Sequence, residues 1–334
     1  MECISKKGYK RPEISILLPV YNAEKWIERT VNSVLSQDFS DFELVCIDDG
    51  GSDKSADIIE RIAQNDCRIK LIKKPNGGVA SARQLAIEIM LGRYLFWIDS
   101  DDYIDQGCLK ALYETAEKNS ADVVFVDYIK DMPYKSVRLN QKPGNTFEDC
   151  IEKMMSTELQ GYIAGKLYRT QYIRENAIRF KRGIDFSEDL IFNLKVLYGC
   201  PNIAYLPEAF YHYRFNPDSA TTTFSKEYFN QRFLSIKAIS EEIKGLIVDK
   251  AFIQHKLLIK YGMLVSGCFT EDEYKQIYNI PLKDIRSSSL SFYMKVFLVL
   301  AHIGFYSYTH YLIAVLHRIK SLFCRCSHRV INVC

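Results

Sequence analysis

The sequence carries almost no excess charge, because its 44 Lys and Arg residues face 41 Asp and Glu residues, for a net charge of +3. Proteins that bind nucleic acid through its phosphates usually show a clear basic excess, so no nucleic-acid partner is expected. Internal repeats and low-complexity tracts are also lacking. With 48% hydrophobic and 25% charged residues in 334 positions, the chain can bury a core, which excludes a disordered tail protein.

Two common nucleotide-binding signatures are missing. The first apolar run, Ile14–Val20, is followed by Tyr21-Asn22 and not by the glycine-rich fingerprint of dinucleotide-binding folds. The phosphate-binding loop that ends in Gly-Lys-Ser/Thr is absent as well. A dehydrogenase is therefore not expected. A bound diphosphate would need another source of positive charge, which a divalent ion held by carboxylates can supply.

A secretory signal is not recognisable either. The run Ile14–Val20 is too short for one, so we expect a reducing cytoplasm for the 10 scattered cysteines. One cluster of possible metal ligands, Cys324-Arg325-Cys326-Ser327-His328, lacks the second ligand pair of a zinc site, so no structural zinc is expected there.

The first 130 residues alternate apolar strands with helices. Gly92 is expected to form the left-handed C-terminal cap of the third helix. Short strands joined by helices predict a mostly parallel sheet with helices on both faces. Strands are predicted at 14–19, 42–47, 69–72, 94–98 and 123–126, and helices at 23–37, from a cap at Ser52 or Asp53 to about 63, at 79–90 and at 106–118.

The remainder of the chain loses this alternation. Residues 132–146 have the composition of a loop, and residues 209–214 form an aromatic strand. Helices are predicted near 148–157 and 190–197, and residues 226–275 are helical and amphipathic.

Polar residues follow three of the predicted strands, at Tyr21-Asn22, Asp48-Asp49 and Asp99–Asp102. In open α/β sheets ligands bind outside the carboxyl ends of the strands, so these residues indicate one site. The carboxylates of Asp99 and Asp101, separated by one residue, are suited to a hard cation whose open positions go to phosphate oxygens. The alternative is a solvated turn or a helix cap, which the position after a buried strand makes the weaker interpretation.

A second acidic pair, Glu188-Asp189, precedes a predicted helix. Acidic residues stabilise a helix N-terminus by roughly 0.3–1 kcal/mol, so the pair is explained by capping alone. It is explained equally well by a general base that takes a proton from a sugar hydroxyl. The spacing leaves both interpretations open.

Six segments lie in a fixed order along the chain, at 16–24, 47–53, 76–83, 99–103, 187–192, and 211–214 with 219–221. In that order they resemble the motifs of family 2 glycosyltransferases of the bacterial surface-polysaccharide type. The resemblance implies an inverting enzyme with the GT-A fold. Gly51 and Gln84 depart from the serine and asparagine that are common in the family, which concerns loop shape more than chemistry.

The resemblance implies a nucleotide-diphosphate sugar as donor, with UDP favoured. Pro19, Val20 and Tyr21 are then expected at the nucleobase pocket and Glu24 near the ribose. Asp49 is expected to accept a hydrogen bond from the base. The further donor-binding residues implied by the resemblance are Arg83, Asp99, Ser100, Arg214 and Ser219.

The resemblance also implies the chemistry. Asp101, with Asp99 in the metal shell, is expected to ligate Mn²⁺ or Mg²⁺. Asp189 is expected to be the base, with Glu188 beside it. A metal that neutralises the departing diphosphate removes the need for an acid, which agrees with a single base and an inverting reaction. A hexosyl- or N-acetylhexosaminyltransferase follows from this interpretation.

The last part of the chain has no Asp, Glu, Lys or Arg between residues 296 and 316, but contains several tyrosines and histidines and is followed by basic residues. Such a run can span a bilayer, belong to the core or lie on a membrane surface, and we favour two short interfacial helices broken near 304–307. We therefore expect an enzyme that is peripheral on the inner face of the cell membrane, with a saccharide or lipid-linked saccharide acceptor.

The expected domains are a catalytic domain over 1–225, a helical extension over 226–289 and an amphipathic basic tail over 290–334. Within the first, the nucleotide-sugar half covers about 12–130 and the acceptor half about 131–225. Two alternative functions remain at this stage, a sugar-1-phosphate nucleotidyltransferase and a non-catalytic nucleotide-sugar binding protein. The first should have a basic, glycine-rich loop after the first strand, and the second should lack Asp101 or Asp189.

Overall fold

The computed structural model describes residues 11–181, 183–216, 225–242 and 249–316. The chain divides into two compact units, which are described separately. The first, here called the sheet unit, comprises residues up to 218 together with 237–246, and the second, the helical unit, comprises 219–236 and the residues from 247 onward.

The first half of the sheet unit is a parallel sheet built from segments that are neighbours in sequence. The strand order is β3-β2-β1-β4, and every pair is parallel. Side chains of β1 and β2 are almost all buried, as expected for strands covered on both faces. The elements are β1 (Ile14–Val20), α1 (Ile27–Leu35), β2 (Phe42–Asp48), α2 (Ser55–Ala63), β3 (Ile69–Lys73), α3 (Val79–Ile89) and β4 (Tyr94–Trp97).

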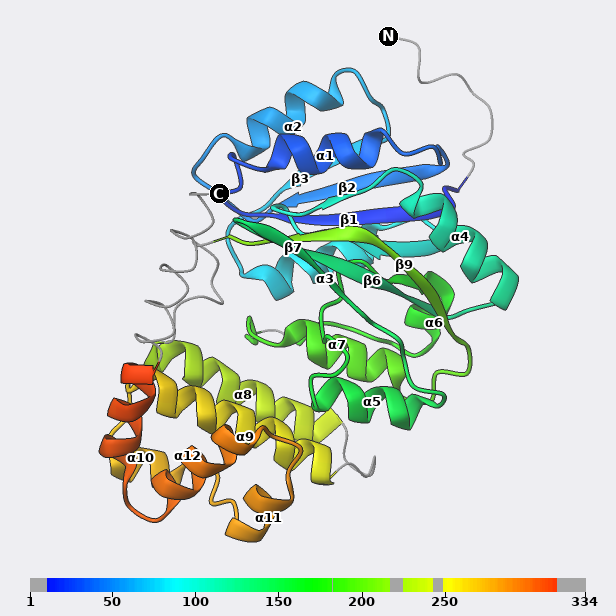
Figure 1. The fold of residues 1–334 in the computed structure, drawn as a ribbon. Coiled ribbons are helices and arrows are strands. Elements are labelled where there is room, and N and C mark those ends of the chain that lie inside the picture. The colour runs from blue at the N-terminus through cyan, green and yellow to red at the C-terminus, as the bar shows by residue number, and fades with distance from the viewer. Residues whose placement is uncertain (1–10, 182, 217–224, 243–248, 317–334) are drawn as a thin grey trace, which may run out of the picture. The chain divides into compact units, whose positions relative to one another are not determined.

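The helices of this half lie on both faces of the sheet, as predicted. α1 and α2 lie on one side and α3 on the other (Figure 1). Right-handed crossovers produce this arrangement, because β1 to β3 progress toward one edge and β4 returns to the opposite side of β1. The carboxyl ends of β1, β2 and β4 therefore lie side by side, and in the register Val20 pairs with Asp48 and Leu17 with Trp97.

The second half of the sheet unit is mixed. β8 joins the two halves, because it is antiparallel to both β4 and β6, while β9 runs parallel to β6 and antiparallel to β5. The elements are β5 (Tyr103–Ile104), α4 (Cys108–Asn119), β6 (Val123–Met132), β7 (Lys135–Leu139), α5 (Phe147–Met155), β8 (Leu167–Arg169), α6 (Thr170–Glu175), α7 (Glu188–Leu197) and β9 (Ile203–Arg214).

Two local expectations were wrong. Part of the segment predicted as a loop, 132–146, forms a hairpin in which β7 pairs with β6. The side chains of β7 are mostly exposed, so the strand has no apolar pattern to reveal it. Gly92 is not a left-handed helix cap, because α3 ends at Ile89; a Cβ at Gly92 would lie 2.3 Å from the backbone nitrogen of Ser15. The glycine is there for a close backbone approach to β1.

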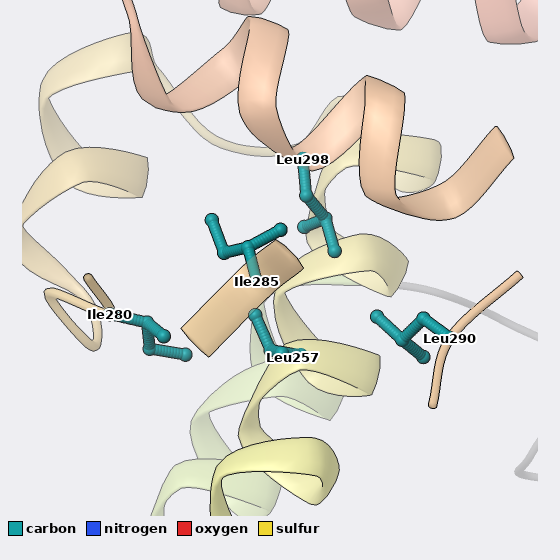
Figure 2. Packing of buried hydrophobic residues seen from close by; sticks show 5 residues of the cluster. All are labelled: Leu257, Ile280, Ile285, Leu290 and Leu298. Atoms are coloured by element: carbon teal, nitrogen blue, oxygen red, sulfur yellow. The ribbon is translucent and has the colours of Figure 1, made fainter. Parts of the chain in front are cut away.

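The helical unit has a core of its own. Leu257 from α9, Ile285 from α11 and Leu298 from α12 point toward one another, together with Ile280 and Leu290 (Figure 2). The prediction that residues 226–275 are helical is confirmed for most of the described part of this segment. The elements are α8 (Lys226–Glu242), which continues into the sheet unit, α9 (Asp249–Ser266), α10 (Glu271–Gln276), α11 (Leu282–Ser287) and α12 (Phe292–His302), followed by helical residues 306–316.

The predicted break in the last segment is confirmed, because α12 ends at His302 and the next helix begins at residue 306. No helix within the described ranges has both the length and the apolar composition that crossing a bilayer requires. Each of the two helices buries one side, Phe297, Leu298 and Ala301 on α12 and Tyr306, Thr309 and Ile313 on the next. The basic cluster after residue 316, including Cys324 and Cys326, lies outside the described residues.

Candidate active site

A pocket of about 420 Å³ opens at the carboxyl ends of β1, β2 and β4, a size typical of small-molecule sites. Six of the predicted donor-binding residues line it: Pro19, Val20, Tyr21, Asp49, Asp99 and Ser100. The residues that follow these three strands therefore meet at one pocket. The remaining lining residues come from the start of α3 and the loop before it: Asn76, Gly78, Val79 and Ala82.

These four residues were missed, although a signal was present. They belong to the segment 76–83, which was matched to a family motif but in which only Arg83 was given a role. Gly78 is required by the backbone, since its φ is +82° and an added Cβ would lie 2.4 Å from Oδ1 of Asp185. A glycine pair directly before a helix indicates a close approach of this kind.

Asp49 lines the pocket, and its carboxylate is held by neighbouring residues. Its Oδ1 accepts a hydrogen bond from the backbone N–H of Gly77 at 3.1 Å and forms an ion pair with Lys74. Gly50, with φ of +72°, allows the chain to pass the backbone of Asn76, where a Cβ would lie 2.7 Å from the nitrogen. The carboxylate is thus fixed in orientation before any ligand arrives.

The acidic segment after β4 is anchored from β9 and α1. Tyr211 Oη donates to Asp102 Oδ2 at 2.6 Å and accepts from the backbone N–H of Asp99 at 3.2 Å. Thr30 Oγ1 donates to the carbonyl oxygen of Asp102 at 2.7 Å. Asp101 Oδ2 accepts from Asn216 Nδ2 at 2.8 Å. Asp102 therefore serves the structure through both of its carboxylate oxygens.

Negative charge in this segment is only partly balanced. Burial, with the nearby charge of Asp99, raises the pKa of Asp101, although Asn216 opposes the change. Burial and the charges of Asp99 and Asp101 likewise raise the pKa of Asp102. The positive side chain of Arg214, which lies 3.9 Å over the ring of Trp26, offsets part of the charge on Asp101.

Arg83 connects this segment to the second acidic pair. Its Nη2 lies 2.9 Å from Asp99 Oδ1, and its Nη1 forms an ion pair with Glu188. The guanidinium is buried, and Asp99, Glu188 and Asp189 outweigh the effect of burial and raise its pKa. Its buried Nε has no hydrogen-bond partner among the described residues. The prediction that Arg83 approaches the donor site from the third helix agrees with this position.

The pair Glu188-Asp189 begins α7, directly after Ser187 in a left-handed conformation with φ of +60°. Asp189 Oδ1 accepts from the N–H of Leu190 at 2.7 Å, which is a helix-terminus contact. Glu188, however, faces Arg83, so capping alone does not explain the pair. Burial raises the pKa of both carboxyls, and Arg83 opposes that change in both.

Three other predicted donor residues, Glu24, Arg83 and Arg214, do not line the pocket. Glu24 is exposed, and its Oε2 accepts from the backbone N–H of Lys54 at 3.1 Å at the start of α2; it does not line the pocket. Ser219 lies outside the described residues. Within the parts of the chain that the structure describes, no group of three or more His, Cys, Asp or Glu side chains is arranged to hold a metal ion.

The sequence model of the family described as glycosyl transferase family 2 matches residues 15–183. The chain belongs to this family. Among its relatives, EpsJ of Bacillus subtilis, an uncharacterized glycosyltransferase, is 33% identical over 219 residues, which are 63% of this chain and 63% of EpsJ. The glycosyltransferase GlyA of Streptococcus pneumoniae is 26% identical over 272 residues, 76% of this chain but 37% of GlyA. The chain thus spans less than two thirds of the length of these relatives.

Solved structures agree on the fold. A crystal structure of residues 1–349 of Staphylococcus aureus TarS in complex with UDP-GlcNAc matches with a TM-score of 0.66 at 19% identity, covering 92% of each chain. The match to the longer TarS structure covers 89% of this chain and 55% of that one. The sheet unit therefore has the GT-A fold, as predicted, and helices follow it in the chain.

Proposed function

We propose that this glycosyltransferase moves a sugar from a nucleotide-diphosphate donor, with UDP as the nucleotide, to a hydroxyl group of a saccharide acceptor. The observation that carries the proposal is the position of Arg83, which touches Asp99 of the donor pocket and Glu188 of the acidic pair. Through Arg83, the carboxylates after β4 and the acidic pair Glu188-Asp189 would belong to one reaction centre.

The pocket supports the donor assignment. Val20 and Tyr21 offer apolar and aromatic surface for a nucleobase, and Asp49 offers a fixed acceptor for a base N–H. The relative TarS is named a poly(ribitol-phosphate) β-N-acetylglucosaminyltransferase, which supports a hexosyl or N-acetylhexosaminyl donor. Its complex with UDP-GlcNAc makes UDP-GlcNAc the first donor to test.

We assign Asp99 and Asp101 to a Mn²⁺ or Mg²⁺ ion. Two carboxylates without a third protein ligand fit a cation of this kind, which is commonly held by one or two carboxylates plus substrate phosphates and water. The pKa of Asp101, which burial and the charge of Asp99 raise, also fits, because a cation would favour the ionised carboxylate. Bound here, the ion would neutralise the charge that develops on the departing diphosphate.

We assign Asp189 as the general base. Glu188 is committed to Arg83, while Asp189 touches only the N–H of its own helix in the described structure, so one oxygen remains for a substrate. The acceptor hydroxyl loses its proton to Asp189 as its oxygen bonds to the anomeric carbon. The bond from that carbon to the diphosphate breaks, and the nucleotide diphosphate leaves from the opposite face, which inverts the configuration.

The helical unit supports a location at a membrane. The two last helices carry exposed apolar side chains opposite their buried sides, and Tyr308 and Tyr311 are 63% and 68% exposed. We call the following set the outer stripe: Phe292, Tyr293, Val296, Ile303, Phe305, Tyr308, Tyr311 and Leu316.

No acidic residue follows Asp284 in the sequence, whereas Arg286 and Lys295 lie beside the stripe in the chain. Apolar burial combined with basic charge fits an anionic bilayer surface. We therefore propose that the enzyme is peripheral on the cytoplasmic face and uses a lipid-linked saccharide in the synthesis of a surface polysaccharide.

Incubation of the purified chain with a panel of nucleotide-sugars and Mn²⁺ tests the reaction, with release of free nucleotide as the readout. UDP should be released from one or more UDP-sugars and not from the matching GDP- or CMP-sugars. Release of pyrophosphate from UTP and a sugar phosphate, with no donor hydrolysis, would instead identify a nucleotidyltransferase.

A further inference from the structure

Lys166, which precedes β8, is fully buried, yet no carboxylate is within hydrogen-bond distance of it in the described structure. Its Nζ lies 3.0 Å from Tyr128 Oη and 3.4 Å from the carbonyl oxygen of Gln160, and it also donates to the carbonyl oxygen of Tyr162. Tyr128 Oη gives its own proton to Ala164 O at 2.6 Å, so it can only accept from Lys166. Three acceptors match the three N–H bonds of an ammonium group.

The ammonium lies inside a loop formed by residues 160–166, here called the lysine loop. The loop is fastened to α7 by Asn193, whose Nδ2 donates to Gly161 O at 2.7 Å and to Tyr162 O at 3.1 Å. A Cβ at Gly161 would lie 3.1 Å from Cδ1 of Leu190, the residue after Asp189. The lysine loop is therefore packed against the first turn of the helix that carries the acidic pair.

The charge of Lys166 has the sign that favours the carboxylate form of Asp189. Burial and the charge of Asp99 raise the pKa of Asp189, and Arg83, the N–H of Leu190 and, to the smallest extent, Lys166 oppose this increase. Arg83 is already shared between Asp99 and Glu188, which leaves Lys166 as a second cation for Asp189. The other groups that interact with Asp189 are Asp99, Glu188 and the hydroxyls of Tyr128, Tyr162 and Tyr168.

We propose that Lys166 is a positioning residue for glycosyl transfer, which holds the lysine loop against α7 and keeps Asp189 in its carboxylate form without touching the substrate. The proposal rests on the proposed function of Asp189 as the base. It assigns two separable actions, one by contact and one by charge.

The chain contains a matched control in the helical unit. Lys260 is buried as well, and its Nζ donates to the carbonyl oxygens of Tyr274, Ile277 and Tyr278 at 2.9, 2.7 and 3.1 Å. Burial lowers the pKa of Lys260 to about 8 and that of Lys166 to about 7. Replacing either by methionine removes a buried ammonium and leaves three oxygens without a donor, so both variants should lose stability. Of these two lysines, Lys166 interacts electrostatically with Asp189, whereas the pKa of Lys260 is changed by burial alone.

The experiment compares Lys166→Met, Lys260→Met and the wild type in the pH dependence of kcat for sugar transfer. In Lys166→Met the fall of kcat at low pH should begin at a higher pH, and the maximal kcat should drop on the order of 10-fold or more because the base is less well positioned. Lys260→Met should keep the wild-type profile. Equal profiles for all three proteins would overturn the proposal.

Two further measurements keep the test decisive if Lys166→Met does not fold. Asn193→Ala retains the charge of Lys166 but loosens the lysine loop. It should lower kcat without changing the pH at which kcat falls on the acid side. A wild-type kcat in this variant would refute the contact role. Carboxyl NMR of ¹³C-labelled aspartate, assigned with Asp189→Asn, reports the pKa of Asp189 without turnover. The pKa of Asp189 should be higher in Lys166→Met than in the wild type. Failure of the wild type to transfer sugar would refute the proposed function, whereas this NMR result would still decide the charge role.

Discussion

The two halves of the sheet unit differ in how they are built and in what they contribute. In the first half, strands that follow one another in sequence lie in a parallel sheet, and their ends form the pocket. In the second half, β8 pairs with β4 and β6, and α7 brings the acidic pair to Arg83. Under the proposed function, donor binding depends on the first half and proton removal on the second, so mutations should separate them.

The largest effect is expected in the second half. Asp189→Asn keeps the shape of the side chain but removes the base, so sugar transfer should fall on the order of 10²–10⁴-fold while donor binding persists. Glu188→Gln is the matched comparison in the same turn. Wild-type turnover in Asp189→Asn together with lost turnover in Glu188→Gln would mean that the roles within the pair are reversed.

In the first half, Asp101→Ala should remove most activity and the metal-dependent part of donor binding, because one of two proposed ligands is lost. The fold should persist, since the substitution removes the hydrogen bond from Asn216 but leaves those that Tyr211 and the N–H of Arg214 donate to Asp102. Asp57→Ala on the exposed side of α2 is the control. Full turnover of the wild type in excess EDTA would rule out the metal.

The connection between the halves is tested by Arg83→Met. Loss of one partner from a buried ion pair costs about 3–5 kcal/mol of stability when the other charge is left uncompensated. Burial already raises the folded pKa of Glu188 above its unfolded value, and loss of Arg83 would raise it further. The folded state then binds the extra proton over a wider range, and stability should fall as pH rises between the unfolded and folded pKa values. Urea unfolding across pH measures this, and adding Glu188→Gln should restore part of the loss. A pH-independent loss would contradict the role given to Glu188.

The smallest effect on turnover is expected outside both halves. Tyr308→Ser with Tyr311→Ser removes two exposed members of the outer stripe and should leave hydrolysis of a soluble donor unchanged. Co-sedimentation with anionic vesicles should weaken in this variant, and in the wild type it should weaken at high salt. If the wild-type protein does not co-sediment with anionic vesicles at low salt, a membrane surface is not its partner.

The sequence was sufficient for the first half because its structure is local. Buried strands leave continuous apolar runs such as Ile14–Val20, and the polar residues after them must meet at one edge. In the second half the register depends on distant partners, and β7 is stabilised by pairing with β6 while its side chains stay exposed. No local pattern records such pairing.

The site follows the same division. Asp49 and Asp99 follow strands, and the positions of those strand ends bring both residues to one pocket. The contact of Arg83 with Glu188 joins residues far apart in the chain and could not be derived from spacing. Lys166 was missed because a single lysine in the sequence is read as solvent-exposed. Only its three buried oxygen partners show that it belongs to the interior.

The separation of binding from chemistry is tested most directly by calorimetric titration of UDP, with Mn²⁺ present, into the wild type, Asp189→Asn and Asp101→Ala. Equal affinity of the wild type and Asp189→Asn, with binding lost in Asp101→Ala, is the result expected if the first half alone holds the donor. Absence of UDP binding by the wild type, or equal loss of binding in both variants, would contradict the account.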